Sequence, residues 1–312
     1  WNFFWWVLGT IFAPIAVPYF MLESWSHFKA RKIQNDLPGK VVLITGASSG
    51  LGEALSFIFY KAGCRLILSG RRNQELERVK AELLGLHLET STYPPVILPM
   101  DLAELNSLPG KVNDALAVFG HIDILVNNAG VSVRSDILST SVDVDIKIML
   151  VNYFGGIALT KAILPSMIKR RNGRVVFISS VQGKFSIPFR SAYSASKHSV
   201  QAFCDCLRAE VEDYNVKVTC ISPGYIKTSL SQNALTGDGE KYGVLDKTTN
   251  DGVEAKEMAE KILCAILRDR KDIIIAQLSA RIAYYLRFFF PSIYFWIMTR
   301  RARKLRTNAC EK

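Results

Sequence analysis

Short apolar runs recur along the chain, and polar or glycine-containing segments separate them. Runs of this length and composition are typical of strands that are buried on both faces of a sheet. The first run, residues 40–45, leads directly into three glycines and then into a helical pattern of apolar positions. The pattern therefore predicts a strand, a glycine turn and a helix. Similar runs occupy residues 64–69, 95–100, 122–126 and 216–222.

The glycine segment after the first run has the spacing G-x-x-x-G-x-G. We expect Gly46 to allow a tight turn, Gly50 to let backbone approach a pyrophosphate, and Gly52 to let the helix pack on the strand. A diphosphate would then lie at the helix N-terminus, where the backbone amides and the helix dipole favour an anion. The segment consists of Thr45, Gly46, Ala47, Ser48, Ser49, Gly50, Leu51 and Gly52.

Tyr193 and Lys197 are four residues apart, which is about one helical turn, so a helix would place them on one face. A nearby ammonium favours the phenolate form of a tyrosine and lowers its pKa. The phenol then becomes a usable proton donor and acceptor. Ser180, thirteen residues upstream, is the candidate for holding the substrate oxygen. Taken alone, the pair would more often be a solvated helix surface, and the other motifs decide against that interpretation.

Further polar residues follow the remaining apolar runs in a fixed order: Asp101, then 127–130, then Asn152, then Pro223 and Gly224. With this order, residues 38–275 resemble the short-chain dehydrogenase/reductase family. The resemblance implies an α/β fold, a Rossmann-type doubly wound parallel sheet in one domain. Residues 142–145, 152–155, 164–171 and 187–198 resemble more closely the member 7 group of that family, in particular its 7B-like branch, whose substrates are poorly defined.

The resemblance also implies roles for single residues. Tyr193 would protonate a carbonyl oxygen while hydride moves from nicotinamide, Ser180 would hydrogen-bond that oxygen, and Lys197 would bind the nicotinamide ribose. Asn152 would line a water-linked proton path, Asp101 with Leu102 would bind adenine, Asn128 would hold the central strand, and Thr228 would reach the carboxamide. The catalytic set is Asn152, Ser180, Tyr193 and Lys197. The cofactor set is Thr45, Gly46, Ser48, Ser49, Gly50, Leu51, Gly52, Arg71, Arg72, Asp101, Leu102, Asn128, Ala129, Gly130, Tyr193, Lys197, Pro223, Gly224, Ile226 and Thr228.

The end of the second apolar run bears on the choice of cofactor. An enzyme that uses NAD usually places an acid there for the ribose 2′-hydroxyl, whereas this chain has Arg71 and Arg72. Guanidinium groups can hold a 2′-phosphate through charge-assisted hydrogen bonds. We therefore expect NADP(H) to be preferred over NAD(H). The alternative is that both arginines belong to a helix surface and pair with Glu75 and Glu77.

The chain of 312 residues has a net charge of +11, but residues 300–312 hold six Lys/Arg and one Glu. The remainder is only mildly basic, and no basic patch interleaved with aromatic residues indicates nucleic-acid binding. The six cysteines and four histidines show no metal-ligand spacing, so we expect no metal site. We interpret the cysteines as buried thiols.

Residues 1–22 carry no Lys or Arg and match the length of about 20 residues that a spanning helix needs. We expect a single-pass anchor followed by a basic linker, residues 23–37, rather than a cleaved signal peptide, because residues 19–22 are bulky. The flank places the domain in the cytosol by the positive-inside rule, although the 7B-like branch is often assigned the reverse orientation. The endoplasmic reticulum is the first expectation for location, with the peroxisome as the alternative.

Residues 276–312 form a second apolar extension, with only 12 uncharged residues between Arg287 and Arg300. This length is too short to span a bilayer, but aromatic residues followed by a basic cluster suit an amphipathic helix in the membrane interface. The alternative is a helix that covers the domain core or a dimer face.

The sequence thus predicts a membrane-anchored carbonyl reductase or alcohol dehydrogenase that acts on a lipophilic substrate such as a steroid, retinoid or glycerolipid ketone. Residues 225–253, which include Gly237, Gly239 and Gly243, are expected to form a flexible lid. By resemblance, a homodimer would form through residues 152–170 and 191–214. The alternatives are a soluble carbonyl reductase that is merely tethered, and a catalytically inactive scaffold or sensor that binds the cofactor at a membrane.

Overall fold

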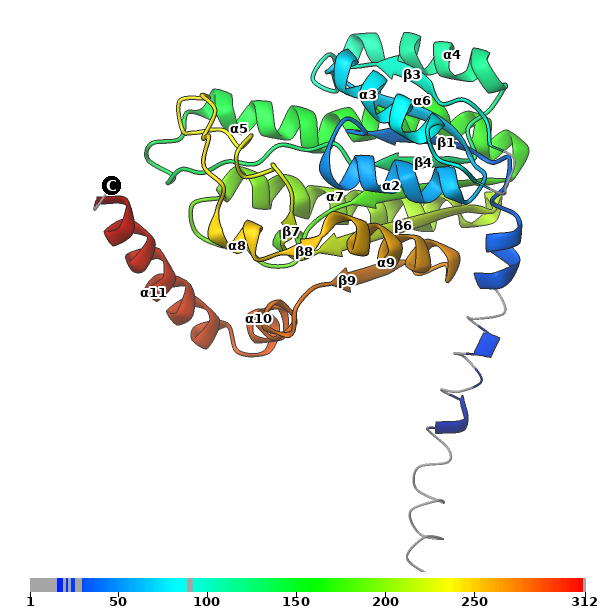
Figure 1. Cartoon of the computed structure of the whole chain (residues 1–312). Coiled ribbons are helices and arrows are strands. Elements are labelled where there is room, and N and C mark those ends of the chain that lie inside the picture. The colour runs from blue at the N-terminus through cyan, green and yellow to red at the C-terminus, as the bar shows by residue number, and fades with distance from the viewer. Residues whose placement is uncertain (1–15, 19–20, 22–23, 26–29, 89–91, 311–312) are drawn as a thin grey trace, which may run out of the picture.

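The computed structural model describes residues 16–18, 21, 24–25, 30–88 and 92–310. Its centre is a seven-stranded parallel sheet in the order β3-β2-β1-β4-β5-β6-β9 (Figure 1). The chain reverses its direction of winding between β1 and β4, which is the switch point of a doubly wound sheet. The strands are β1 Val41–Thr45, β2 Arg65–Gly70, β3 Val96–Pro99, β4 Ile124–Asn127, β5 Gly173–Ile178, β6 Val216–Pro223 and β9 Asp272–Ile275.

Helices cover both faces of the sheet because successive strand residues point in opposite directions. In β1, Val42 and Ile44 pack into one core and Val41 and Leu43 into the other. The predicted Rossmann-type fold is confirmed. The first core lies under α2 Gly50–Lys61, α3 Asn73–Leu84 and α9 Ala255–Leu267, and the second under α4 Leu108–Phe119, α6 Gly155–Arg170 and α7 Ser191–Val211.

Short elements connect this frame to the carboxyl edge of the sheet. The expected lid starts beside β7 Ile226–Lys227 and ends at β8 Val253–Glu254, and these two strands pair with each other. The ends of the lid are therefore joined. The other short elements are η1 Leu105–Ser107, α5 Val142–Met149, η2 Leu150–Phe154, η3 Val181–Gly183, η4 Glu212–Tyr214 and α8 Lys247–Asn250.

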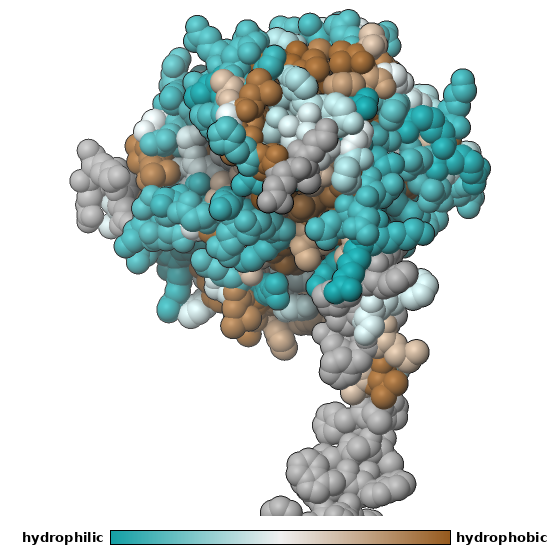
Figure 2. Space-filling view, turned by 45° about the vertical axis from the view of Figure 1, so that its right-hand side comes forward, coloured by the Kyte–Doolittle hydropathy of each residue, from teal (hydrophilic) through white to brown (hydrophobic). Residues whose placement is uncertain are grey.

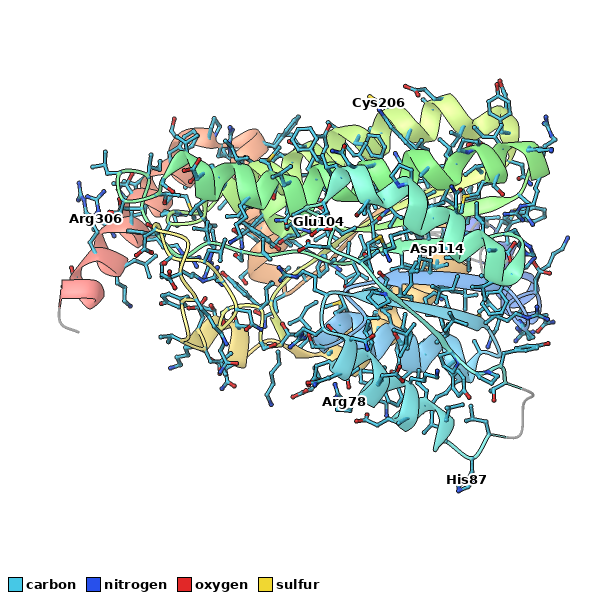
Figure 3. The ribbon with its side chains drawn as sticks, turned by 90° about the horizontal axis from the view of Figure 1, so that it is seen from above. Arg78, His87, Glu104, Asp114, Cys206 and Arg306 are labelled. Atoms are coloured by element: carbon cyan, nitrogen blue, oxygen red, sulfur yellow. The ribbon has the colours of Figure 1, made fainter. Side chains whose placement is uncertain are left out.

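The C-terminal extension forms two helices, α10 Leu278–Phe289 and α11 Pro291–Cys310. Pro291 begins the second helix because its ring fixes φ and its missing N–H suits a first helical position. In Figure 1, α11 extends away from the catalytic body, and Figure 3 places its Arg306 at the opposite end of the molecule from His87. Tyr294 helps to fix α11 to the body, because it is buried and its hydroxyl donates to the carbonyl of Ser186.

The predicted anchor, residues 1–22, lies mostly outside the described residues. Within the described part of the chain, one helical stretch, Val142–Arg170, is long and apolar enough to cross a membrane by length and composition. This stretch belongs to the catalytic domain, where Leu159, Ile163 and Met167 are fully buried in its second core. It is therefore weak evidence for a membrane span.

Candidate active site

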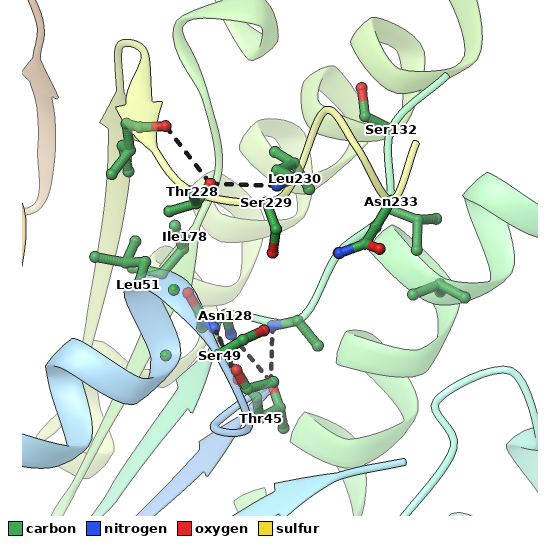
Figure 4. Close-up of a pocket in the computed structure, with 18 of the residues that line it drawn as sticks. Thr45, Ser49, Leu51, Asn128, Ser132, Ile178, Thr228, Ser229, Leu230 and Asn233 are labelled. Atoms are coloured by element: carbon green, nitrogen blue, oxygen red, sulfur yellow. Dashed lines mark hydrogen bonds between the residues drawn. The ribbon is translucent and has the colours of Figure 1, made fainter. Parts of the chain in front are cut away.

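A cavity of about 500 Å³ opens at the carboxyl ends of the strands, beside the switch point between β1 and β4. Ligands of doubly wound sheets bind in this position because the loops diverge there. Figure 4 shows the two sides of the cavity, with Thr45, Ser49 and Asn128 facing Thr228 and Asn233 across it. We call the side formed by the loops after β1, β2 and β3 the cofactor half, and the side lined by Tyr193, Arg134 and Tyr225 the substrate half.

The glycine turn of the cofactor half has a backbone that larger residues would not fit. Gly46 and Gly50 have φ values of +67° and +59°, in the left-handed region that glycine adopts readily. A Cβ on Gly52 would lie 2.1 Å from the carbonyl oxygen of Gly46, so α2 begins in close contact with the turn. Backbone amides and an open cradle are thus left for a ligand at the N-terminus of α2.

Asn128 ties β4 to this turn. Its side-chain amide donates to the carbonyl of Thr45 at 2.9 Å, and the Thr45 hydroxyl accepts from the backbone amides of Asn128 and Ala129 (Figure 4). The structure therefore places Asn128 where a strand-holding role was expected.

Two arginines stand at the edge of the same turn. Arg72 donates to the hydroxyls of Ser48 and Ser49 at 3.1 and 2.8 Å. Arg71 is 61% exposed and lies 3.9 Å from a carboxylate oxygen of Asp101. Neither pairs with Glu75, which bonds to Arg78 instead. Both guanidinium groups remain within reach of a ligand in the cavity.

The predicted catalytic side chains meet in the substrate half. Ser180 follows β5, and its hydroxyl accepts from the backbone amide of Gln182 at 3.1 Å. Tyr193 and Lys197 lie one turn apart on α7, and both are buried. The Lys197 ammonium donates to the carbonyl of Ile178 at 2.9 Å and lies 5.7 Å from the centre of the Tyr193 ring. The spacing in the sequence thus places all three groups at one wall of the cavity.

Burial dominates the proton affinities of this group. Burial raises the pKa of Tyr193, while the Ser180 hydroxyl and the charges of Arg134 and Arg190 oppose that rise. Burial also lowers the pKa of Lys197 to about 8. The sequence predicted a lowered pKa for Tyr193 through Lys197, and in this structure that prediction is wrong in direction because the desolvation of the phenol outweighs the favourable charges.

Asn152 lies in a π-helical turn, η2, between α5 and α6. Such turns often occur at functional sites because they displace one side chain from the helical register. The Asn152 amide donates to the carbonyl of Val131 and to the hydroxyl of Ser196, both at 2.9 Å, and its oxygen accepts from the Val131 amide at 2.8 Å. Asn152 therefore links the loop after β4 to α7 from behind the cavity wall, and a role in a proton path stays a prediction.

The comparisons with known proteins agree with this geometry. Residues 40–238 match the family model of the short chain dehydrogenases. The chain belongs to the short-chain dehydrogenase/reductase family. A Drosophila melanogaster dehydrogenase/reductase SDR family protein 7-like is 60% identical over 98% of this chain and 93% of its own length. A Bos taurus dehydrogenase/reductase SDR family member 7B is 49% identical over 93% and 88%.

Solved structures of other short-chain dehydrogenases share the fold. One from Streptomyces avermitilis has a TM-score of 0.70 at 27% identity, covering 84% of this chain and 97% of that one. The alcohol dehydrogenase of the archaeon Thermococcus sibiricus, complexed with 5-hydroxy-NADP, has a TM-score of 0.62 at 25% identity, covering 77% and 94%.

Within this dehydrogenase, every residue of the predicted cofactor set lines the cavity, and so do Ser180, Tyr193 and Lys197. Asn152 alone of the predicted site residues does not. The described residues contain no cluster of side chains suited to a metal.

Sequence reasoning missed a second group of side chains in the substrate half. Arg134, Arg190 and Arg301 gather around Asp246 and Tyr225, although they are far apart in the chain. Of these residues, only Arg190 lies close in sequence to a predicted catalytic residue, three positions before Tyr193. Arg301 was counted with the basic tail, and Tyr225 and Asp246 with the lid.

Proposed function

We propose that the protein is an NADP(H)-dependent oxidoreductase that interconverts a carbonyl and an alcohol, with Tyr193 as the general acid and base. One observation carries this proposal: Ser180, Tyr193 and Lys197 line the same cavity as the glycine turn at the N-terminus of α2. A site for a dinucleotide and a proton-transferring triad are thereby adjacent. The archaeal alcohol dehydrogenase is complexed with 5-hydroxy-NADP, which supports a nicotinamide cofactor for this protein too.

The residues present fit such a cofactor. The open turn around Gly46 and Gly50 suits a diphosphate, and Arg71 and Arg72 suit a 2′-phosphate. Asp101 and Leu102 would hold adenine, Asn128, Ala129 and Gly130 would lie along the ribose, and Thr228 would meet the carboxamide. Bound there, the nicotinamide supplies or accepts the hydride. The preference for NADP(H) over NAD(H) rests on the two arginines.

The chain's own residues then do three things. The Ser180 hydroxyl donates a hydrogen bond to the substrate oxygen, which stabilises the charge that develops there. Tyr193 gives that oxygen its proton in reduction and removes it in oxidation. Lys197 binds the ribose hydroxyls with its ammonium. Burial raises the pKa of Tyr193, so the phenol stays protonated near neutral pH and is available as the acid that reduction requires.

The test of this function is Tyr193→Phe. The variant should lose turnover of a ketone panel by at least about a thousandfold, since it removes the proton donor. NADPH binding, measured by calorimetry, should persist because the glycine turn and the arginines are intact. A native protein that binds NADPH but reduces no lipid or water-soluble carbonyl would instead favour the inactive scaffold or sensor. Retained activity in the variant would exclude Tyr193 as the acid.

The C-terminal extension supports a lipophilic substrate and a membrane surface as partner. Phe288 is 74% and Trp296 54% exposed, and Arg300 lies 3.8 Å over the Trp296 ring. Large exposed aromatic residues beside a basic segment suit a bilayer interface. The face in Figure 2 is mostly hydrophilic, with separate hydrophobic patches.

We place the protein at the endoplasmic reticulum, with the peroxisome as alternative. We also infer a homodimer that forms through α6 and α7.

Membrane attachment is tested by deletion of residues 1–30. The native protein should resist alkaline carbonate, whereas the deleted form should be extracted, because only α10 and α11 then hold it and they lie at the surface. It should leave membranes with high salt and mild detergent and retain activity on water-soluble ketones. Resistance of the deleted form to carbonate would mean that the extension inserts deeply, and full solubility at low salt would refute its interfacial role.

A further inference from the structure

Two buried arginines share one carboxylate in the substrate half. Arg134 donates through Nε to Asp246 at 2.6 Å, and Arg190 donates through Nη2 to the same oxygen at 2.9 Å. The side chains of both arginines are 10% exposed, and that of Asp246 is 15% exposed. Two positive charges therefore meet a single negative charge out of bulk water, where screening is weak. The pair keeps a net positive charge.

The rest of the cluster holds this charge in place without neutralising it. Arg134 also donates to the hydroxyl of Ser132 at 2.7 Å and to the carbonyl of Val133 at 2.9 Å. Arg190 donates to the Tyr225 hydroxyl at 3.2 Å, and Arg301 of α11 approaches the same hydroxyl at 3.3 Å. The Nε of Arg190 is buried and has no partner among the described residues. A buried charge that is only partly compensated costs free energy, and such groups cluster at functional sites.

Tyr193 lies on the wall of the cavity that Arg134 also lines. Arg134 and Tyr225 line the same cavity as Tyr193, and Arg190 immediately precedes α7, three residues before it. Burial raises the pKa of Tyr193, and Arg134 and Arg190 both act against that rise, while Tyr225 adds to it. The other ionisable or polar groups around Tyr193 are Ser180 after β5, Lys197 on α7, Lys241 in the lid, and Asp246 and Arg301 behind the arginines.

Lys197 cannot supply a positive charge that is constant over the alkaline pH range. Its pKa is lowered to about 8 by burial, so the ammonium loses its proton as the pH rises through that value. The ordinary pKa of an arginine lies far above this range, so Arg134 remains cationic even though burial and the charge of Arg190 lower its pKa. The arginine pair is therefore the more durable source of positive charge beside the phenol.

We propose that Arg134 and Arg190 are positioning residues for catalysis, which supply the fixed positive charge that stabilises the phenolate form of Tyr193. This role rests on the proposed function, in which Tyr193 exchanges a proton with the substrate oxygen. Asp246 limits the charge and fixes the two guanidinium groups. Arg301 connects the same cluster to α11, so the C-terminal extension contacts the cluster through the Tyr225 hydroxyl.

The experiment reads the ionisation of Tyr193 directly and needs no substrate. The full chain in detergent micelles is labelled with carbon-13 at tyrosine Cζ, and the Tyr193 signal is assigned by its loss in Tyr193→Phe. At about pH 10, Arg134→Gln and Arg190→Gln should each lower the ratio of phenolate to phenol roughly tenfold, since an opposite charge has been removed. Asp246→Asn should raise the ratio, because it removes the only carboxylate of the cluster.

Two matched variants separate charge from structure. Arg134→Lys keeps the positive charge and should restore much of the ratio. Arg174→Gln breaks a comparable partly buried pair with Asp269, at 2.8 Å by β5, and should leave Tyr193 unchanged. An unchanged ratio in both glutamine variants refutes the proposal. A shift in the same direction for the glutamine variants and Asp246→Asn also refutes it, because that pattern reports damage to the cleft. The Tyr193→Phe activity assay decides the proposed function independently.

Discussion

In the cofactor half of the cleft the arginines are exposed, whereas in the substrate half they are buried. Arg71 is 61% exposed, while Arg134 and Arg190 are each 10% exposed and share one carboxylate. An exposed guanidinium is hydrated and screened, and it gains strength only when a bound anion displaces water. A buried guanidinium acts continuously on its neighbours. On the two proposals made above, the charge in the cofactor half acts on the bound ligand, whereas the charge in the substrate half acts on the protein's own tyrosine.

The largest effect in the cofactor half should come from its backbone rather than its charges. In Gly52→Ala the new Cβ would lie 2.1 Å from the carbonyl oxygen of Gly46, so the turn must move. We expect NADPH affinity to fall by at least about a hundredfold, since the backbone can no longer approach the diphosphate. Gly110→Ala in α4 is the control, because its Cβ meets nothing within 4 Å. Calorimetry that showed equal affinities for the two variants would contradict the proposed cradle.

The two halves also differ in how much of them the sequence predicts. The cofactor half comes from contiguous motifs such as residues 45–52, because a strand, a tight turn and a helix N-terminus are encoded locally. Ser180, Tyr193 and Lys197 are similarly close in the chain. The substrate half joins Arg134 to Asp246, 112 residues apart, and Arg190 to Tyr225, 35 apart. No periodicity reports such contacts, because they arise only when the lid folds over the sheet.

The proton affinity of Tyr193 shows the same limit. The four-residue spacing predicted Lys197 correctly as a neighbour, but the sign of the pKa shift depends on how deeply both groups are buried. Burial is a property of the packed wall, to which α5, α7 and the lid all contribute. In the extension the sequence predicted one amphipathic helix, whereas the structure has two helices, the second of which begins at Pro291.

The next effect in size concerns the exposed arginines. Replacing Arg71 and Arg72 by Ala leaves a 2′-phosphate without its charged donors. Hydrogen bonds to charged groups contribute about 1.5–3 kcal/mol each, so each lost arginine should weaken NADPH binding about tenfold or more. NADH binding should change far less, since it has no 2′-phosphate. Equal losses for both cofactors in calorimetry would show that these arginines support the turn through Ser48 and Ser49 and do not select the cofactor.

The smallest expected effect is the pH dependence of NADPH binding. It concerns Lys197, which lies beside Tyr193 in the substrate half and, in the proposed function, binds the ribose of the cofactor. Burial lowers its pKa to about 8, below the ordinary 10.5, so in the free protein it loses its proton as the pH rises through 8. The ammonium donates stronger, charge-assisted hydrogen bonds to the ribose hydroxyls than the neutral amine does, so binding favours the charged form and raises the pKa of Lys197. Just above pH 8, binding should therefore take up as much as about one proton, and NADPH affinity should fall by at most about tenfold per pH unit.

Calorimetry in buffers of different ionisation enthalpy measures this proton uptake, and Lys197→Arg is the matched variant because it stays cationic throughout. The 2′-phosphate does not interfere, since its second pKa is about 6. Native protein should take up protons between about pH 8 and 9, and the arginine variant should not.

The lowered pKa of Lys197 also affects folding stability. Unfolded chains bind more protons than folded ones between about pH 8 and 10.5, so the free energy of unfolding should rise with pH across that window. Cofactor affinity and folding stability should thus respond to alkaline pH in opposite directions. If native protein and the arginine variant bind NADPH with identical proton uptake, Lys197 does not contact the cofactor as an ammonium, and the link between the two halves of the cleft must run through another residue.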